Sequence, residues 1–268
     1  DRYTEGYGIS FQGVDHAAKE GVGLIIALDC GIKAIDKVAY ANERGIDFII
    51  CDHHLPGGTI PEAVAVLDPK RPDCPYPFKE LSGCGIGFKL MQALAQHNGI
   101  AFSELEPLLD LVAISTACDI VPVNGENRVL SHFGLKRLNK GPVRPGVQAM
   151  LGMTNFKREL TITDLVFVIG PRINAAGRLS DMTLGIECLL TDDAGRADEL
   201  ARLLDVINRE RREIEGGMRD QAFVIAETLL AEGINGDFEP PPALCVFDAG
   251  FHEGVVGIVA SRLKDRLH

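Results

Sequence analysis

The sequence predicts an α/β fold: a parallel-sheet domain, a long connecting helix and the start of a smaller α/β domain. Three apolar runs, at residues 24–28, 47–51 and 64–67, are typical of short buried strands. Residues 35–44 have helical spacing, which makes the first two runs part of a strand–helix–strand unit with parallel strands. The apolar stripe along residues 193–231 predicts a single long helix.

Turn-forming residues set the limits of the first elements. Residues 24–28 are continuously apolar, which predicts a strand covered on both faces. Gly45 is placed to end the helix before it, since glycine favours the position after a helix C-terminus. Pro69, in the pair Asp68-Pro69, ends the third strand because proline has no backbone donor.

The rest of the chain is predicted to be mainly helical. Helical spacing recurs at residues 87–96 and 105–117, before the long helix. The prolines at 240–242 predict a linker, followed by a strand at 243–247 and a glycine-opened helix at 254–260. We therefore divide the chain into a sheet domain (1–150), a connecting region (151–240) and the beginning of a further domain (241–268).

Composition indicates a soluble, reduced protein. Of the 268 residues, 46% are hydrophobic and 24% charged, and no apolar run reaches the length of a membrane helix. The seven cysteines are scattered and none forms a Cys-x-x-Cys pair. This pattern favours free thiols and a cytoplasmic location over a disulfide framework or a zinc ribbon.

The net charge of −11 conceals a basic stretch. Between Arg128 and Arg178 there are nine basic and two acidic residues, so this window is +7 and the remainder is −18. A local basic surface can bind phosphate on an acidic protein because salt screens distant charges within about 8–10 Å. A solvated basic face explains the charge equally well.

Carboxylates and imidazoles follow two of the predicted strands. Asp52, His53 and His54 come directly after the second strand, and Asp29 after the first. The carboxyl ends of neighbouring parallel strands meet at one edge of the sheet, where ligands bind in such folds. Asp119 ends a predicted helix, where the helix dipole disfavours a carboxylate without a cation. Mixed oxygen and nitrogen ligands suit a transition metal.

These residues carry a resemblance to the DHH phosphoesterase superfamily. The matching motifs are Ala27-Leu28-Asp29-Cys30-Gly31, Asp52-His53-His54 and Ala117-Cys118-Asp119. Three further segments resemble the single-strand-specific exonucleases of that superfamily: residues 2–8, 170–178 and 252–262. The resemblance covers essentially the whole chain and implies a DHH domain followed by the start of a DHHA1-type domain.

The resemblance implies a two-metal hydrolase that removes nucleotides from the 5′ end of single-stranded DNA in repair and recombination. Mn²⁺ is the implied metal, with Mg²⁺ as a substitute, and Asp29, His53 and Asp119 are the implied ligands. His54 would face the scissile phosphate, and Asp52 would orient the two histidines. The implied partners are single-stranded DNA and a single-strand-binding protein or helicase, with no membrane.

Further residues are predicted to bind DNA. Arginines suit phosphate oxygens, the start of a glycine-opened helix can hold a phosphate, and a tyrosine can stack on a base. The residues are Arg2, Tyr7, Arg172, Asn174, Arg178, His252, Ser261 and Arg262. For Arg172 and Arg178, which we place in a glycine-rich turn, an ion pair with a nearby acid is the alternative.

Two other functions remain open. The family's first motif, an Asp-x-Asp pair, is not in this sequence, so we expect this chain alone to have weak or no activity. One alternative is a phosphoesterase of the same superfamily that acts on pyrophosphate or short dinucleotides. The other is a non-catalytic DNA-binding scaffold, like the pseudo-nuclease subunit of the eukaryotic replicative helicase.

Overall fold

The computed structural model describes two compact units. One comprises residues 1–143 and 151–170, and the other comprises residues 144–150 and 171–268. The described residues are 5–119, 121–154, 158–232 and 243–267. Each unit is taken by itself below.

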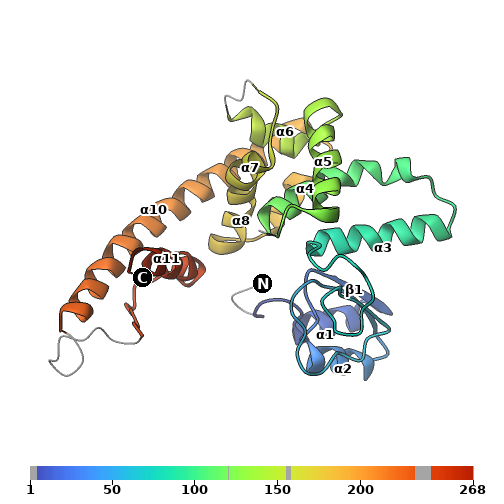
Figure 1. Ribbon diagram of the computed structural model, residues 1–268, viewed down its shortest axis with the longest axis horizontal. Coiled ribbons are helices and arrows are strands. Elements are labelled where there is room, and N and C mark those ends of the chain that lie inside the picture. The colour runs from blue at the N-terminus through green and yellow to red at the C-terminus, as the bar shows by residue number, and fades with distance from the viewer. Residues whose placement is uncertain (1–4, 120, 155–157, 233–242, 268) are drawn as a thin grey trace. The chain divides into compact units, whose positions relative to one another are not determined.

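A parallel sheet of three strands organises the first unit. Its strands are β1 (Leu24–Leu28), β2 (Asp47–Cys51) and β3 (Ala65–Leu67), in the order β1-β2-β3. The predicted parallel pairing and α/β class are confirmed (Figure 1). The register pairs Leu28 with Cys51 and Cys51 with Leu67, so the three strands end side by side. The residues that follow them therefore share one edge of the sheet.

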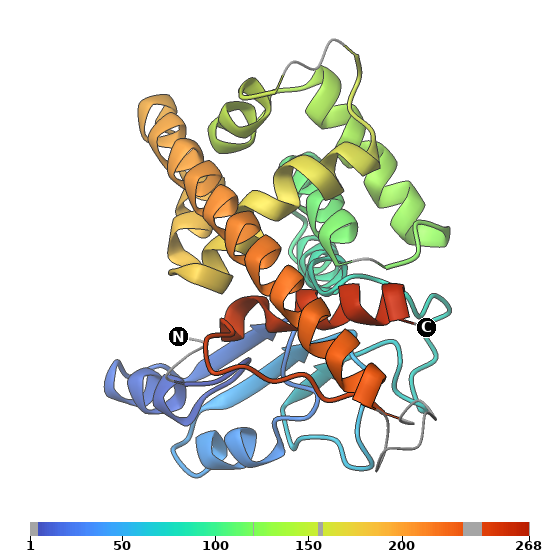
Figure 2. The same ribbon diagram turned by 90° about the vertical axis from the view of Figure 1, so that its left-hand side faces the viewer.

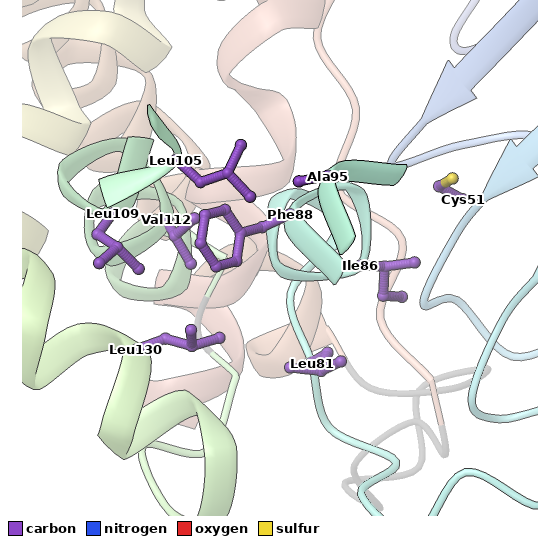
Figure 3. Packing of buried hydrophobic residues seen from close by; sticks show 9 residues of the cluster. All are labelled: Cys51, Leu81, Ile86, Phe88, Ala95, Leu105, Leu109, Val112 and Leu130. Atoms are coloured by element: carbon purple, nitrogen blue, oxygen red, sulfur yellow. The ribbon is translucent and has the colours of Figure 1, made fainter. Parts of the chain in front are cut away.

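Helices cover the sheet unevenly. α1 (Phe11–Lys19) and α2 (Ile35–Asn42) bury Val14 and Val38 against Phe48 and Ile50 of β2. A second cluster joins Cys51 of β2 to the apolar faces of α3 and the helices after it (Figure 3). These two clusters fix the strand ends from both sides of β2. Their burial is the main stabilising contribution that the hydrophobic effect makes here.

The prediction that the first strand is covered on both faces is wrong for the described residues. Leu24, Ile26 and Leu28 are 45%, 47% and 54% exposed, whereas Ala27 is buried. Successive side chains of a strand point to opposite faces, and only the face towards α1 and α2 is filled. β1 is also the edge strand of the described sheet, so one of its backbone edges has no partner strand among the described residues.

Helices complete the first unit. They are α3 (Gly83–His97), η1 (Phe102–Glu104), η2 (Glu106–Leu108), α4 (Leu109–Cys118), α5 (Gly125–Lys140), α7 (Ile162–Asp164) and the π-helical turn η3 (Leu165–Ile169). The predicted helix at 105–117 starts as a 3₁₀ turn, because Pro107 lacks a donor and favours a first helical turn. α4 is buried around most of its surface and packs against α5. Gly134 permits this packing, since a Cβ there would collide with the backbone of Leu109.

The second unit is built around one long helix. Its helices are α6 (Pro145–Gly152), α8 (Gly170–Leu179), α9 (Thr183–Leu190), α10 (Ala194–Glu232) and α11 (Glu253–Leu267), with the ends of α6 and α8 shared with the first unit. α10 confirms the predicted long helix. α11 crosses α10 and packs against it through Met218, Ala222, Val255 and Val259 (Figure 2).

The end of the chain differs from the prediction. Residues 243–247 form no strand, since none of the described residues of this unit pairs with them. The predicted proline linker at 240–242 lies outside the described residues. The glycine-opened helix is confirmed as α11. Among the described helices, none combines the length and the apolar character that crossing a bilayer requires.

Candidate metal centre

The predicted site residues meet at the carboxyl edge of the sheet. Asp29 follows β1, and its backbone N–H donates to the carbonyl of Cys51 over 2.8 Å. Asp52 follows β2, and its backbone N–H donates to the carbonyl of Leu67 over 3.0 Å. These two bonds continue the sheet by one residue and bring both carboxylates to the same edge. The juxtaposition predicted from the strand ends is therefore present.

Asp52 organises the histidine pair. It is 1% exposed, and its Oδ2 accepts the backbone N–H of Ile32 at 2.9 Å. Its Oδ1 accepts the backbone N–H groups of His53 (2.8 Å) and His54 (3.2 Å) and lies 2.7 Å from Nδ1 of His54. Burial alone would raise the pKa of Asp52, but these bonds together lower it. Asp52 is thus an ionised anchor that fixes the ring of His54.

His53 stands between two carboxylates. Its Nε2 lies 3.2 Å from Oδ1 of Asp29 and 3.2 Å from Oδ2 of Asp119. Neither contact meets the angular criteria for a hydrogen bond. Among the described residues, Nε2 of His53 and the buried Oδ2 of Asp119 therefore have no hydrogen-bond partner. A carboxylate contact with Asp29 raises the pKa of His53, and burial raises the pKa of Asp119. Three possible ligand atoms, one each from Asp29, His53 and Asp119, therefore converge at this point.

Gly83 makes room for this arrangement. It begins α3, and a Cβ built on it would collide with the Asp29 carboxylate. Asp29 itself has φ of +63°, which non-glycine residues rarely adopt and which is typical of strained functional positions. The backbone of Gly83 also hydrogen-bonds Asp119. Ser82 caps the helix by accepting the N–H of Gly85 at 3.1 Å. The positive end of α3 therefore faces both carboxylates.

These observations fit a divalent cation. Asp29, His53 and His54 offer ligand atoms within 4.8 Å of one another, and Asp119 reaches the same Nε2 of His53. Buried polar atoms are normally hydrogen-bonded, so convergent atoms without partners indicate a missing ligand. Carboxylate and imidazole are the donors that manganese and similar metals accept. Gly83, which sequence reasoning missed, is recognisable only as a glycine directly after a Ser N-cap.

A cavity of about 290 Å³ opens beside the centre. Asp29, Asp52 and His54 line one side, and Tyr7 and Lys33 also border it. Tyr7 is 75% exposed, so it does not belong to the core. Lys33 was not predicted as a site residue, because no motif marks it. The cavity leaves the side chain of His54 accessible to a small molecule from outside.

The neighbouring cysteines are poor metal ligands. Burial raises the pKa of Cys84 and of Cys118 to about 11, and it also raises the pKa of Cys30. A thiol ligates a metal as the thiolate. At neutral pH these groups are protonated, and they pack as small apolar side chains.

Most of the predicted DNA-binding residues lie in the second unit. Arg172, Asn174 and Arg178 are on the helix α8, so the prediction that they form a glycine-rich turn is wrong. Gly170 and Pro171 begin this helix, and proline is favoured in the first turn of a helix. Arg172 forms an ion pair with Asp205 at 2.8 Å, as the alternative proposed. Arg178 donates to the carbonyl of Gly254 at 3.0 Å.

The remaining candidates lie at α11. The ring Nδ1 of His252 accepts the N–H of Gly254 at 3.1 Å, which caps the start of the helix. Ser261 and Arg262 follow on α11, and Arg262 lies 3.5 Å from Glu215 of α10. Arg2 lies outside the described residues.

Acids neutralise part of the basic stretch. Lys140 pairs with Glu159 at 3.3 Å, and Arg158 makes two bonds to Asp164 at 2.7 and 2.8 Å. Glu159 and Asp164 are the two acids already counted in this stretch, so the pair of Arg172 with Asp205 is the one of these three that adds an acid from outside it.

A larger cavity lies away from these residues. It measures about 570 Å³ and is lined mainly by α3 and α5, with Phe102 and Phe133 on its walls. None of the predicted site residues borders it. Its size therefore does not mark the chemical centre.

Comparison with known proteins agrees with the fold. Residues 5–116 match the DHH family, N-terminal domain. Over 100% of its length the chain is 42% identical to the single-stranded-DNA-specific exonuclease RecJ of Salmonella typhimurium and 38% identical to that of Bacillus subtilis. It covers 48% and 32% of those proteins, so it spans half or less of their length.

Solved structures give the same result. A crystal structure of exonuclease RecJ bound to manganese matches 100% of this chain, with a TM-score of 0.82 and 32% identity, and the match covers 64% of that chain. RecJ from Thermus thermophilus in complex with Mn²⁺ matches 97% of this chain at a TM-score of 0.82 and 31% identity, over 37% of its own length. The resemblance inferred from the motifs is confirmed. Residues 5–116 therefore form a domain of the DHH family, and over its whole length the chain is similar to RecJ exonucleases.

Proposed function

We propose that the protein carrying this chain is a metal-dependent exonuclease that removes nucleotides from the 5′ end of single-stranded DNA. The observation that carries the proposal is the convergence of Asp29, His53 and Asp119 without hydrogen-bond geometry. The relatives named as single-stranded-DNA-specific exonucleases support the substrate class. By the same relationship, DNA repair and recombination in the cytoplasm are its proposed context.

Asp29, His53 and Asp119 would hold the metal. Mn²⁺ is the favoured ion and Mg²⁺ a substitute, since the related structures contain one or the other. A bound pair of such ions would neutralise phosphate charge and activate water for attack on a phosphodiester. The chain's own contribution is to hold the ligands: Asp52 fixes the backbone of both histidines, and α3 faces the carboxylates.

His54 is the proposed catalytic residue. Its Nδ1 is directed at the ionised Asp52, so the ring carries a proton on Nδ1 and offers Nε2 to the cavity. Its side chain is 51% exposed and borders the 290 Å³ cavity. From this position Nε2 can donate to a phosphate oxygen when protonated, or accept a proton from water when neutral.

The other predicted residues would guide DNA. Tyr7 is placed to stack on a base beside the cavity. Arg172, Asn174 and Arg178 of α8 and His252, Ser261 and Arg262 at α11 are proposed phosphate contacts, and Arg2 is proposed for the terminal phosphate. Arg172 would exchange Asp205 for phosphate. A single-strand-binding protein or a helicase is the proposed protein partner.

The test is cleavage of matched substrates by the natural protein that carries this chain. With Mn²⁺, it is expected to release mononucleotides from a single-stranded oligonucleotide and to leave the same sequence as a blunt duplex largely intact. Faster cleavage of dinucleotides or pyrophosphate than of the oligonucleotide would favour a small-molecule phosphoesterase. Tight binding of single strands with no cleavage in any metal would favour a scaffold.

Metal binding is expected to weaken at acid pH. A ligating imidazole must be neutral, and the pKa of His53 is raised above its ordinary value of about 6.5. Protons therefore compete with Mn²⁺ already above pH 6.5, and affinity falls about tenfold for each unit below the folded pKa. In the metal-free protein the same shift stabilises the fold below about pH 6.5, and this is lost as pH rises through the folded pKa. Calorimetric titration between pH 5.5 and 8 measures the first effect; an affinity independent of pH would contradict it.

A further inference from the structure

A third aspartate follows the sheet. β1, β2 and β3 end in register, and each is followed by an aspartate: Asp29, Asp52 and Asp68. The first two belong to the site described above, whereas the sequence marked Asp68 only as the end of a strand. Asp68 is 1% exposed. A carboxylate so deeply buried at this edge requires a partner.

Only half of the Asp68 carboxylate is engaged within the described residues. Its Oδ1 accepts the backbone N–H of Lys70 at 2.8 Å, which closes the turn after β3. Its Oδ2 is buried and has no hydrogen-bond partner there. Cys51 pairs with Leu67 in the sheet, so Asp68 follows β3 beside the point where Asp52 and His53 follow β2. One buried acceptor at this edge is therefore without a partner among the described residues.

His53 has the complementary group. Its Nε2 faces Asp29 and Asp119, so Nδ1 lies on the other side of the ring. Nδ1 is also buried and without a hydrogen-bond partner in the described part of the chain. An imidazole that ligates through Nε2 carries its proton on Nδ1, and such ligands almost always donate that proton to a carboxylate, carbonyl or water. Asp52 is not available, since both of its oxygens already accept bonds.

We propose that Asp68 is a positioning residue for the metal centre: its Oδ2 accepts the proton of His53 Nδ1 and holds Nε2 towards Asp29 and Asp119. The proposal rests on the proposed metal centre. The structure shows no hydrogen bond between these two atoms. A metal held at Nε2 would leave the ring proton on Nδ1, where Asp68 could accept it.

Asp68 could instead serve only to close the turn at Lys70. Two substitutions distinguish this role in the turn from the proposed role in positioning His53. A serine can still accept the Lys70 N–H as a turn residue, but it has no second acceptor for His53. An asparagine has one oxygen, so it can serve the turn or the ring but not both. Asp73, an exposed aspartate nearby that pairs with Arg71, gives the matched control Asp73→Ser with the same loss of charge.

The experiment is calorimetric titration of each variant of the chain with MnCl₂. Asp68→Ser is expected to weaken Mn²⁺ affinity about 10–100-fold, the usual effect of removing such a partner. The Mn²⁺ affinity of Asp68→Asn is expected to lie between that of Asp68→Ser and that of the wild type. The affinity of Asp73→Ser is expected to stay within about twofold of the wild type. Thermal unfolding of each variant checks folding; if Asp68→Ser does not fold, Asp68→Asn decides by the same comparison.

The ring of His53 gives a readout that a turn would not change. Nitrogen-15 NMR of the imidazoles, assigned with His53→Ala, is expected to show the proton of wild-type His53 on Nδ1 after addition of Mg²⁺. In Asp68→Ser the two tautomers are expected to mix. Unchanged Mn²⁺ affinity together with an unchanged tautomer would overturn the proposal. Neither measurement uses DNA, so failure of the exonuclease assignment would be seen separately, as absent cleavage by a protein that binds Mn²⁺ normally.

Discussion

His54→Ala is expected to lower the rate of single-strand hydrolysis by about 10²–10⁴-fold, the range for loss of a group that transfers protons in the transition state. The ring is held by a 2.7 Å contact with Asp52 and borders the cavity, so its removal deletes the group nearest to an incoming phosphate. Rates are measured with the natural protein, saturating Mn²⁺ and a 5′-labelled oligonucleotide.

A histidine elsewhere provides the control for His54. His97 is exposed in the last turn of α3, and His97→Ala is expected to cleave DNA at the wild-type rate. Mn²⁺ affinity of His54→Ala is expected to stay within a few-fold of the wild type. Loss of both Mn²⁺ binding and activity in His54→Ala would instead make His54 a metal ligand. Equal rates for His54→Ala and the wild type would contradict its assignment as the catalytic residue.

Gly83→Ala is expected to disable the metal centre without removing any ligand. The new Cβ would occupy the position of the Asp29 carboxylate, so either Asp29 or the start of α3 must move. Overpacking of this kind costs about 1–3 kcal/mol of stability. Because Asp29 faces Nε2 of His53, its displacement is expected to weaken Mn²⁺ affinity at least about tenfold.

Gly87 is the matched control for Gly83. It lies one turn further along α3, and a Cβ there would meet a methyl group of Leu28 at 3.2 Å, which can shift because that side chain is half exposed. Alanine also favours a helix over glycine by about 1 kcal/mol. Gly87→Ala is therefore expected to bind Mn²⁺ normally and to unfold at or above the wild-type temperature. Mn²⁺ affinity of Gly83→Ala within twofold of wild type would contradict the steric argument.

Local patterns were sufficient for the elements around the site. The apolar runs predicted β1 and β2 at their exact bounds, and the stripe of leucines predicted α10 within one residue at each end. These elements depend on residues close in sequence, so periodicity identifies them. The strand predicted at residues 243–247 is absent because a strand also needs a neighbour to pair with, and local pattern does not supply one.

The placement of residues across the site depended on contacts distant in sequence. Asp119 comes to His53 because α4 ends there, and Gly83 is essential because α3 begins against Asp29. The glycine-rich segment at 170–178 was wrongly predicted to be a turn, because proline and glycine occur both in turns and at the start of a helix. The arginines on it then proved to be held by partners on α10 and α11.

The sequence by itself determined the type of chemistry, because carboxylates and imidazoles after parallel strands must gather at one sheet edge. It also determined the family resemblance that the comparisons confirm. Only the tertiary structure decided how the groups are oriented. It directs Nδ1 of His54 to Asp52 and sets Nε2 of His53 between two carboxylates. It also leaves Nδ1 of His53 and Oδ2 of Asp68 buried, with no hydrogen-bond partner among the described residues. The reason is physical: strand order fixes which residues are neighbours, but ring orientation and burial depend on every element that packs around them.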